Sequence, residues 1–221
     1  MCITLARTVT LALVLLTSIE GRSEDIGGSG PLRFLTLNEL ATILPSRTYL
    51  MVDPSAVEQF LAELDGQPPD WATLYGHGHH DPGHDDRLFA LNRERDAKRE
   101  GHPALSRLLT FSWTGELSRY EPDIGGFPVA LGPKFMKTRW GMVRFKPEEA
   151  PGNLSVTTDQ LHRERLQRQL EQGQPMEIDV VMTGKLIPQE SIVYDFSHDE
   201  EGLGLIMPFV RVERVDFVMK P

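Results

Sequence analysis

The sequence predicts an α+β fold in which N-terminal helices pack on a mostly antiparallel β-sheet, either open or closed into part of a barrel. Helical patterns occupy the chain to about residue 100, and strand patterns dominate from there on, apart from one further helix. Residues 176–219 alone hold three apolar-patterned runs separated by short polar turns. Such turns can join antiparallel strands, whereas a parallel crossover needs about a dozen residues or more.

The composition is that of an ordinary globular protein. The chain has 221 residues, of which 40% are hydrophobic and 25% charged, enough to form a hydrophobic core. Its formal net charge of −9 argues against nucleic-acid binding, because that function needs a basic face to neutralise phosphates. The chain also lacks a phosphate-binding glycine loop, a G-x-S-x-G elbow and an H-E-x-x-H zinc motif.

The N-terminus resembles a secretion signal. Arg7 precedes an apolar run from Thr8 to Ile19, and Gly21 supplies a small residue for cleavage. The run is shorter than the ~20 residues that span a bilayer, so we expect no stable membrane span after cleavage, with an uncleaved anchor as the alternative. The expected division is a signal peptide at 1–21, a flexible linker at 22–35 and one α+β domain at 36–221. This organisation predicts a periplasmic or secreted bacterial protein.

Residues 36–100 are expected to be mainly helical. Thr36 and Glu39 form the T-x-x-E pattern of a capping box. Asp53 followed by Pro54 is typical of an N-cap and the first turn of a second helix. Both helices carry apolar residues at helical spacing and are therefore expected to bury one face.

A further helix is expected over about residues 87–99. Its apolar residues are confined to its start, and the rest, NRERDAKRE, mixes charges of both signs. Such a pattern is typical of a solvated helix supported by i,i+4 pairs of about 0.3 kcal/mol each. We therefore expect this helix to fray unless it docks on another element.

Residues 105–221 are expected to be rich in strands. From Leu109 to Leu117 apolar and polar residues alternate, which predicts a half-buried strand. In the last strand the parity of the apolar residues changes at Arg214, which predicts a β-bulge. The other expected elements are strands at 127–131 and 140–145 and a helix at about 158–171, opened by Thr157 with Gln160.

The segment HGHHDPGHDD, residues 77–86, has the most unusual composition in the chain. Imidazoles two to five residues apart on a flexible loop can converge on one zinc or copper ion, and the glycines allow the chain to fold around it. The alternative is a solvent-exposed turn, because Gly, Pro, Asp and His are also common in long surface loops. The candidate metal ligands are His77, His79, His80 and His84.

An acidic turn between two of the last strands is a second candidate site. Asp195, His198 and Glu201 are the candidates for acid–base catalysis there, since neighbouring carboxylates raise the pKa of a histidine. The alternative is a charged turn that keeps the sheet edge soluble.

Aromatic and basic residues in the middle of the chain suggest a third candidate. They could form a sugar- or peptide-binding face, with Trp140 and Arg139 exposed on it, although aromatics at strand spacing are more often part of a core. The aromatics are Trp113, Tyr120 and Trp140, and the cations are Lys134, Lys137, Arg139 and Arg144.

Five runs of the sequence carry a resemblance to a known family. They are LFALNRERDAKR, FSWTGELSRY, ALGPK, WGMVRFKPE and YDFSHDEEGLGLIMPFVRVERV, within residues 88–219. Together they resemble an uncharacterised family of exported bacterial proteins known only as a domain of unknown function. The resemblance implies export and a compact domain, and it assigns no functional residue.

Three classes of function are compatible with these patterns. The export signal, the strand-rich second half and the missing catalytic motifs favour a non-enzymatic binding or accessory module of the cell envelope, with a protein, peptide or glycan partner on a sheet face or edge strand. The alternatives are a metal-binding protein that uses the histidine-rich segment and a cell-envelope hydrolase that uses the acidic turn.

Overall fold

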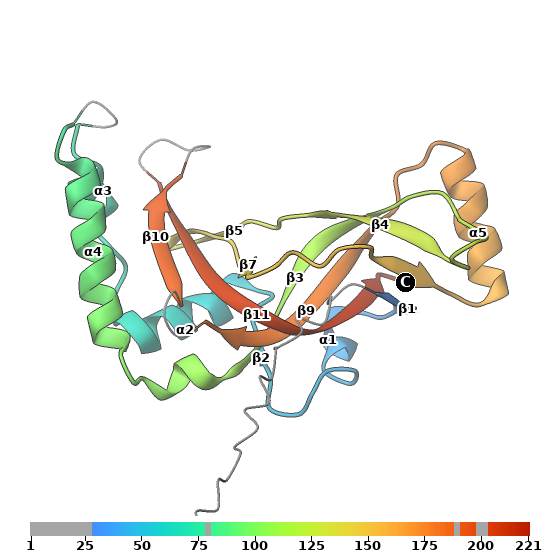
Figure 1. Cartoon of the computed structure of the whole chain (residues 1–221), viewed down its shortest axis with the longest axis horizontal. Helices are drawn as coiled ribbons and strands as arrows, with labels where there is room; N and C mark the ends of the chain where they lie inside the picture. Colours follow the sequence, from blue (N-terminus) through green and yellow to red (C-terminus); the bar gives the residue numbers. More distant parts are fainter. Residues whose placement is uncertain (1–27, 78–80, 188–190, 198–202) are drawn as a thin grey trace, which may run out of the picture.

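The structure is a computed structural model that describes residues 28–77, 81–187, 191–197 and 203–221. A long twisted sheet runs through the molecule, with α2, α3 and α4 at one end and α5 at the other (Figure 1). The helices are α1 Leu37–Leu40, α2 Pro54–Asp65, α3 Trp71–Tyr75, α4 His84–Arg99 and α5 Gln160–Glu171, with a short 3-10 helix at Pro103–Ser106. The strands are β1 Ser29–Phe34, β2 Tyr49–Leu50, β3 Leu108–Leu117, β4 Phe127–Gly132, β5 Met136–Thr138, β6 Gly141–Val143, β7 Lys146–Pro147, β8 Ser155–Thr157, β9 Glu177–Leu186, β10 Ile192–Phe196 and β11 Gly204–Met219.

Six of the strands form a partly closed barrel, which confirms that prediction. Their order is β1-β8-β4-β3-β9-β11, and β1 also pairs with β11, so the sheet closes on itself. The longest ladders join β9 to β3 and to β11, and both are antiparallel. Shorter parallel pairs join β1 to β8 and β11, β2 to β3, and β6 and β7 to β11.

The sheet is therefore mixed: its long ladders are antiparallel, as expected, and the short parallel pairs were not predicted. Each parallel pair joins strands that have other elements between them in the chain. The short turns from which the antiparallel sheet was predicted connect neighbouring strands only, so they contain no information about these distant pairs.

β1 occupies Ser29–Phe34, within the range 22–35 that was expected to be a flexible linker. Its first half pairs with β8 and its second half, Leu32–Phe34, pairs with β11. The sequence SGPLRF holds only two apolar residues among residues typical of turns, so no local pattern predicts a strand there. The strand forms because β8 and β11 offer it backbone partners on both sides.

β11 joins the barrel to a second part of the sheet. Its second half pairs with β9, and its first half pairs with β10 on one side and with β6 and β7 on the other. We call the part formed by β10, the first half of β11, β6, β5 and β7 the extension. The register along β11 shifts between Val212 and Arg214, which confirms the predicted bulge.

One hydrophobic core runs through the barrel and the extension. α2 contributes Val57, Phe60, Leu61 and Leu64, and α5 contributes Leu166. A second, small cluster lies outside the barrel wall, where Leu40 of α1 packs against Val181 and Val218.

α3 packs on the extension where a glycine leaves room for it. A Cβ atom at Gly204 would lie 1.9 Å from the ring of Trp71, so only glycine fits at that position. The indole nitrogen of Trp71 donates a hydrogen bond of 2.6 Å to the carbonyl of Trp140, which fixes α3 on this face of the sheet.

The helix caps agree with the sequence in two cases of three. The amide of Thr36 donates to Glu39 at 2.9 Å, and Asp53 accepts from the amide of Ala56 at 3.0 Å. α5 instead starts with Asp159 as its N-cap, accepting from the amide of His162, and this corrects the predicted pairing of Thr157 with Gln160.

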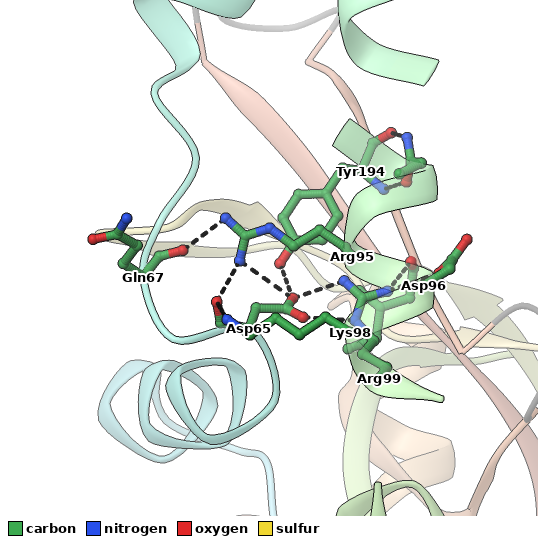
Figure 2. A network of polar contacts seen from close by, with 9 residues as sticks. Asp65, Gln67, Arg95, Asp96, Lys98, Arg99 and Tyr194 are labelled. Carbon is green, nitrogen blue, oxygen red and sulfur yellow. Dashed lines mark hydrogen bonds and ion pairs between the residues drawn. The ribbon is translucent and has the colours of Figure 1, made fainter. Parts of the chain in front are cut away.

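α4 is not the solvated helix that its charged sequence predicts. Arg99 is 1% exposed and Arg95 is also buried. Arg99 donates from Nε and Nη2 to the two carboxylate oxygens of Asp65, each at 2.7 Å, and Tyr194 of β10 donates its phenol to the same carboxylate (Figure 2). We call Asp65, Arg95, Arg99 and Tyr194 the buried polar network.

The cations of α4 also hold the end of α2. Arg95 donates to the carbonyls of Asp65 at 2.8 Å and Gln67 at 2.9 Å, and Lys98 donates to that of Asp65 at 2.6 Å (Figure 2). The last carbonyls of a helix have no partner within it and carry partial negative charge, so cations are favourable there. The basic residues of α4 thereby satisfy groups that would otherwise need water.

α4 further closes the free edge of β10. Asn92 exchanges two hydrogen bonds of 2.8 Å with the backbone of Tyr194, one as acceptor and one as donor. Arg99 donates to the carbonyl of Ile192 at 2.9 Å. Side chains of a helix thus occupy the positions that a further strand would take, and they protect this part of the edge from pairing with another chain.

Protonation in the buried polar network follows from its surroundings. Burial, and then the Asp65 carboxylate, raise the pKa of the Tyr194 phenol far above its ordinary value, so the phenol remains a donor. Burial opposes the charge on Arg99, but hydrogen bonds to Asp65 and the charge of Asp65 outweigh it and raise the pKa of Arg99.

Replacing Asp65 by alanine should lower the free energy of unfolding by about 3–5 kcal/mol, because it removes the buried counter-charge of Arg99 and leaves that guanidinium only the largely exposed carboxylate of Asp96. Asp96→Ala is the matched control, since Asp96 bonds the same guanidinium at 3.1 Å but its side chain is 54% exposed. We expect the control to cost less than about 1 kcal/mol. Urea unfolding curves measure both, and equal losses would contradict a dominant role for Asp65.

The raised pKa of Tyr194 predicts a loss of stability at high pH. A pKa that is higher in the folded than in the unfolded state contributes stability that is complete below the unfolded value of about 10 and is lost as the pH rises above it. Between pH 9 and 11 the parent should therefore lose about 1.4 kcal/mol more than Tyr194→Phe, which has no phenol to ionise. If the free energy of unfolding falls equally in both proteins between pH 9 and 11, ionisation of Tyr194 is not the cause of the loss.

Candidate functional site

The face of the extension that points away from the helices is covered by no other described element. Along β11, Ile206, Pro208 and Val210 are buried on the helix side, and the residues between them point to the opposite side. We call this opposite side the open face. Its residues are Phe135, Lys137, Met142, Arg144, Lys146, Ile187, Val193, Asp195, Leu205, Met207 and Phe209, all of them half-buried or exposed.

Strand pairing places these side chains in adjoining rows. Met207 lies opposite Val193, and Leu205 lies beside Met142. Phe209 lies beside Lys146. None of these apolar side chains belongs to either hydrophobic cluster or packs against one. The rows therefore form a continuous apolar surface that the described part of the fold does not use.

Two cations lie over this apolar surface. The ammonium of Lys146 is 4.6 Å from the centre of the Phe209 ring, and the guanidinium carbon of Arg144 is 5.6 Å from that of Phe135, which is 40% exposed. The Nη2 atom of Arg144 lies 3.7 Å from the sulfur of Met207. Its Nε atom is buried and has no hydrogen-bond partner among the described residues.

The charge of these two cations is not balanced within the described part of the chain. Neither Arg144 nor Lys146 forms an ion pair there, whereas Arg211 at the border of the open face binds Glu148 through two hydrogen bonds of 2.7 and 3.1 Å. Those hydrogen bonds lower the pKa of Glu148. The border at Arg211 is thus electrostatically paired, whereas the side of the open face that carries Arg144 and Lys146 offers positive charge to a partner.

The acid–base candidates are not brought together by the described residues. Asp195 lies on the open face, where its carboxylate accepts a hydrogen bond of 2.8 Å from the amide of Phe196. Asp195 thus binds the backbone of the next residue at the end of β10. The other two candidates, His198 and Glu201, lie outside the described residues.

The histidine-rich segment is described in part. His77 is exposed, and His84 begins α4 with its ring stacked on Phe196 at a centroid distance of 4.9 Å. The other two candidate zinc or copper ligands, His79 and His80, lie outside the described residues. Within the described ranges, no group of three or more histidines, cysteines or carboxylates is placed to hold a metal ion.

Asp81 of the same segment has a structural partner. Arg87 donates to its carboxylate at 2.9 Å, and the amide of Gly83 donates to it at 2.9 Å as well. These hydrogen bonds, the one from Arg87 most, lower the pKa of Asp81. The carboxylate thus orders the turn that leads into α4.

The predicted sugar- or peptide-binding aromatics belong mostly to the core. Trp140 is 3% exposed, so the expectation that it lies on the surface is wrong. Trp113 is buried too, with its indole nitrogen donating to the carbonyl of Phe145 at 2.8 Å. Tyr120 is half-buried and accepts a hydrogen bond from Arg163 at 3.4 Å.

The predicted cations separate into two groups. Lys134 pairs with Asp179 at 3.0 Å. Arg139 donates to Glu58 of α2 from its backbone amide at 2.7 Å and from its Nε atom at 2.6 Å, and these hydrogen bonds, that of the amide first, lower the pKa of Glu58. Lys137 and Arg144 lie on the open face. Two of the four predicted cations are thus part of the candidate site.

Sequence reasoning missed the apolar residues of the open face. In GLIMPFV both parities of β11 are apolar, which is the pattern of a strand buried on both sides. The signal that could have indicated an open side is in WGMVRFKP, where Met142, Arg144 and Lys146 share one parity and therefore one face.

Fold and site together define a mixed α+β protein with a partly closed barrel and a sheet face that no described element covers. Comparison of the chain with protein-family models, curated proteins and solved structures gives no match in any of the three. The resemblance to a family of exported proteins therefore stays a prediction. Among the described residues, no helix has the length and apolar character needed to cross a membrane.

Proposed function

We propose that this protein is a non-enzymatic binding module whose open face docks an acidic, amphipathic segment of a partner protein. The observation that supports this most directly is the combination of continuous apolar rows with two cations, Arg144 and Lys146, that have no ion-pair partner in the described part of the chain. An apolar surface edged by unpaired charge is typical of a protein interaction site.

The chemistry of the open face favours a protein over a glycan. Sugar rings commonly stack on exposed aromatic rings, whereas the two rings of this face already lie under the side chains of Arg144 and Lys146. Methionines at positions 142 and 207 adapt their shape readily to apolar side chains of a partner. Carboxylates of that partner would supply the counter-charges that the two cations lack.

A second copy of the chain fits the open face less well. An isologous dimer places the same patch of both subunits in contact, so the cations of one copy would face those of the other. Like charges that meet in an interface are unfavourable. The partner is therefore a different protein with an acidic surface.

Export belongs to the same proposal. Residues 1–21 carry the pattern of a signal peptide, which would deliver the module to the bacterial periplasm or the exterior. The partner is then an envelope or secreted protein.

Peptide selection tests this function without knowledge of the partner. A library of random peptides displayed on phage is selected on the purified protein, and the peptides obtained should combine acidic with apolar residues. Reversing both charges in Arg144→Glu with Lys146→Glu should weaken their binding at least tenfold, or about 1.4 kcal/mol, because two attractive contacts become repulsive. Isothermal titration at low and high salt measures the change, and salt should weaken binding to the parent.

Arg93→Glu is the control, because Arg93 likewise lies over an exposed aromatic ring, that of Phe89, at 5.8 Å. This pair is on α4, away from the open face, and the control should bind as the parent does. Selected peptides without acidic residues, or equal binding by the double variant, would rule the proposed site out.

A further inference from the structure

A second candidate site, a cleft, lies at the other end of the molecule, between α5 and the barrel. α5 lies at the far right in Figure 1, and the C-terminal end of β11 lies on its inner side. The cleft between them has a volume of about 640 Å³. That is the size of a typical small-molecule site, about 300–1,000 Å³. None of its lining residues belongs to the open face.

Helical spacing directs three polar side chains of α5 into the cleft. His162, Arg165 and Gln169 follow one another at intervals of three and four residues and therefore lie on one side of the helix. Leu166, between them, is buried in the main core and anchors this side of α5 to the barrel. The opposite wall is formed by the start of β9 and the end of β11.

The cleft has an apolar floor. Ile178 and Met219 are buried there, and Phe34 at the end of β1 is half-buried. The imidazole of His162 stacks on the Phe34 ring, with centroids 4.1 Å apart and planes inclined by 24°. Such a floor can accept a hydrocarbon or aromatic body.

His162 is held in place by the N-cap of its own helix. Its amide donates to Asp159 at 3.0 Å, and its Nδ1 atom lies 2.6 Å from the other carboxylate oxygen. The hydrogen bond from the His162 amide, and then that from its ring, lower the pKa of Asp159. The wall of the cleft is therefore formed before any ligand binds, which reduces the entropic cost of binding.

The charges of the lining favour an anion. Lys134 and Asp179 neutralise each other at 3.0 Å. Of the remaining charged residues of the lining, Arg165, Lys220 and Glu177, none forms an ion pair within the described ranges. Among the side chains of the lining, two unpaired cations and one unpaired carboxylate leave an excess of positive charge, in a chain whose net charge is −9.

We propose that this cleft binds a small amphipathic anion, with the apolar body on the floor and the anionic headgroup held by Arg165 and Lys220. Arginine and lysine both bind carboxylate and phosphate groups, so the headgroup is a carboxylate or a phosphate. The site is independent of the open face in its residues and in its ligand.

Titration with simple amphiphiles tests the proposal on the purified chain. Dodecanoate, dodecyl phosphate and dodecyltrimethylammonium share one apolar body and differ in headgroup charge. Isothermal titration below their micelle concentrations should detect binding of at least one of the two anions, at least tenfold tighter than that of the cation. The tighter of the two anions identifies the headgroup.

Variants locate the binding. Arg165→Gln with Lys220→Gln should weaken binding of the preferred anion at least tenfold, and Arg168→Gln should change it less than twofold. Arg168 is exposed on the same helix and does not line the cleft, so it controls for loss of charge on α5. Thermal unfolding confirms that each variant is folded.

Three results would overturn the proposal: no binding of either anion, equal binding of the cation, or unchanged binding by the double glutamine variant. The open-face variant Arg144→Glu with Lys146→Glu should retain anion binding. Loss of anion binding in that variant would place the amphiphile on the open face and would contradict a site at α5. If the open face binds no peptide, by contrast, the proposal of an anion site in the cleft is unaffected.

Discussion

The rest of the structure depends on one buried ion pair. Asp65, the last residue of α2, meets Arg99, the last residue of α4, in a place where neither side chain contacts water. Removing two charges from water costs several kcal/mol each, so the pair is favourable only because its remaining hydrogen-bonding groups are also satisfied. The phenol of Tyr194 and the carbonyl of Ile192 satisfy them, and both belong to β10. A single interaction therefore fixes two helices and one edge strand relative to one another.

The two faces of the extension follow from that arrangement. Because α4 is held against β10, its Asn92 can close the edge of the strand, and α2 and α3 can cover the inner face. No described element remains for the opposite face, although seven of its eleven residues are apolar. The same docking that stabilises one side of the sheet leaves the other side available to a partner.

Positive charge on this acidic protein is unevenly distributed. Some cations of the described surface form ion pairs, as Arg139 does with Glu58. Arg144 and Lys146, and likewise Arg165 and Lys220, form none within the described residues, and they lie beside apolar surface at opposite ends of the molecule. Charge beside apolar surface binds more strongly than charge in free solvent, because the local dielectric constant is lower. The two proposed sites share no residue, so a ligand at one of them would not block the other.

Local patterns in the sequence determined the elements that depend on neighbouring residues. The caps at Thr36 and Asp53, the alternating strand β3 and the bulge near Arg214 are each set by residues a few positions apart, and each is predictable for that reason. Only the tertiary structure decided that β1 is a strand, that Arg95 and Arg99 are buried, and that one face of β11 is open. Those outcomes depend on partners far away in the chain: β8 for β1, Asp65 for Arg99, and the positions of three helices for β11. The sequence of a charged or apolar segment is the same whether that segment contacts water or protein, and only folding determines which of the two it contacts.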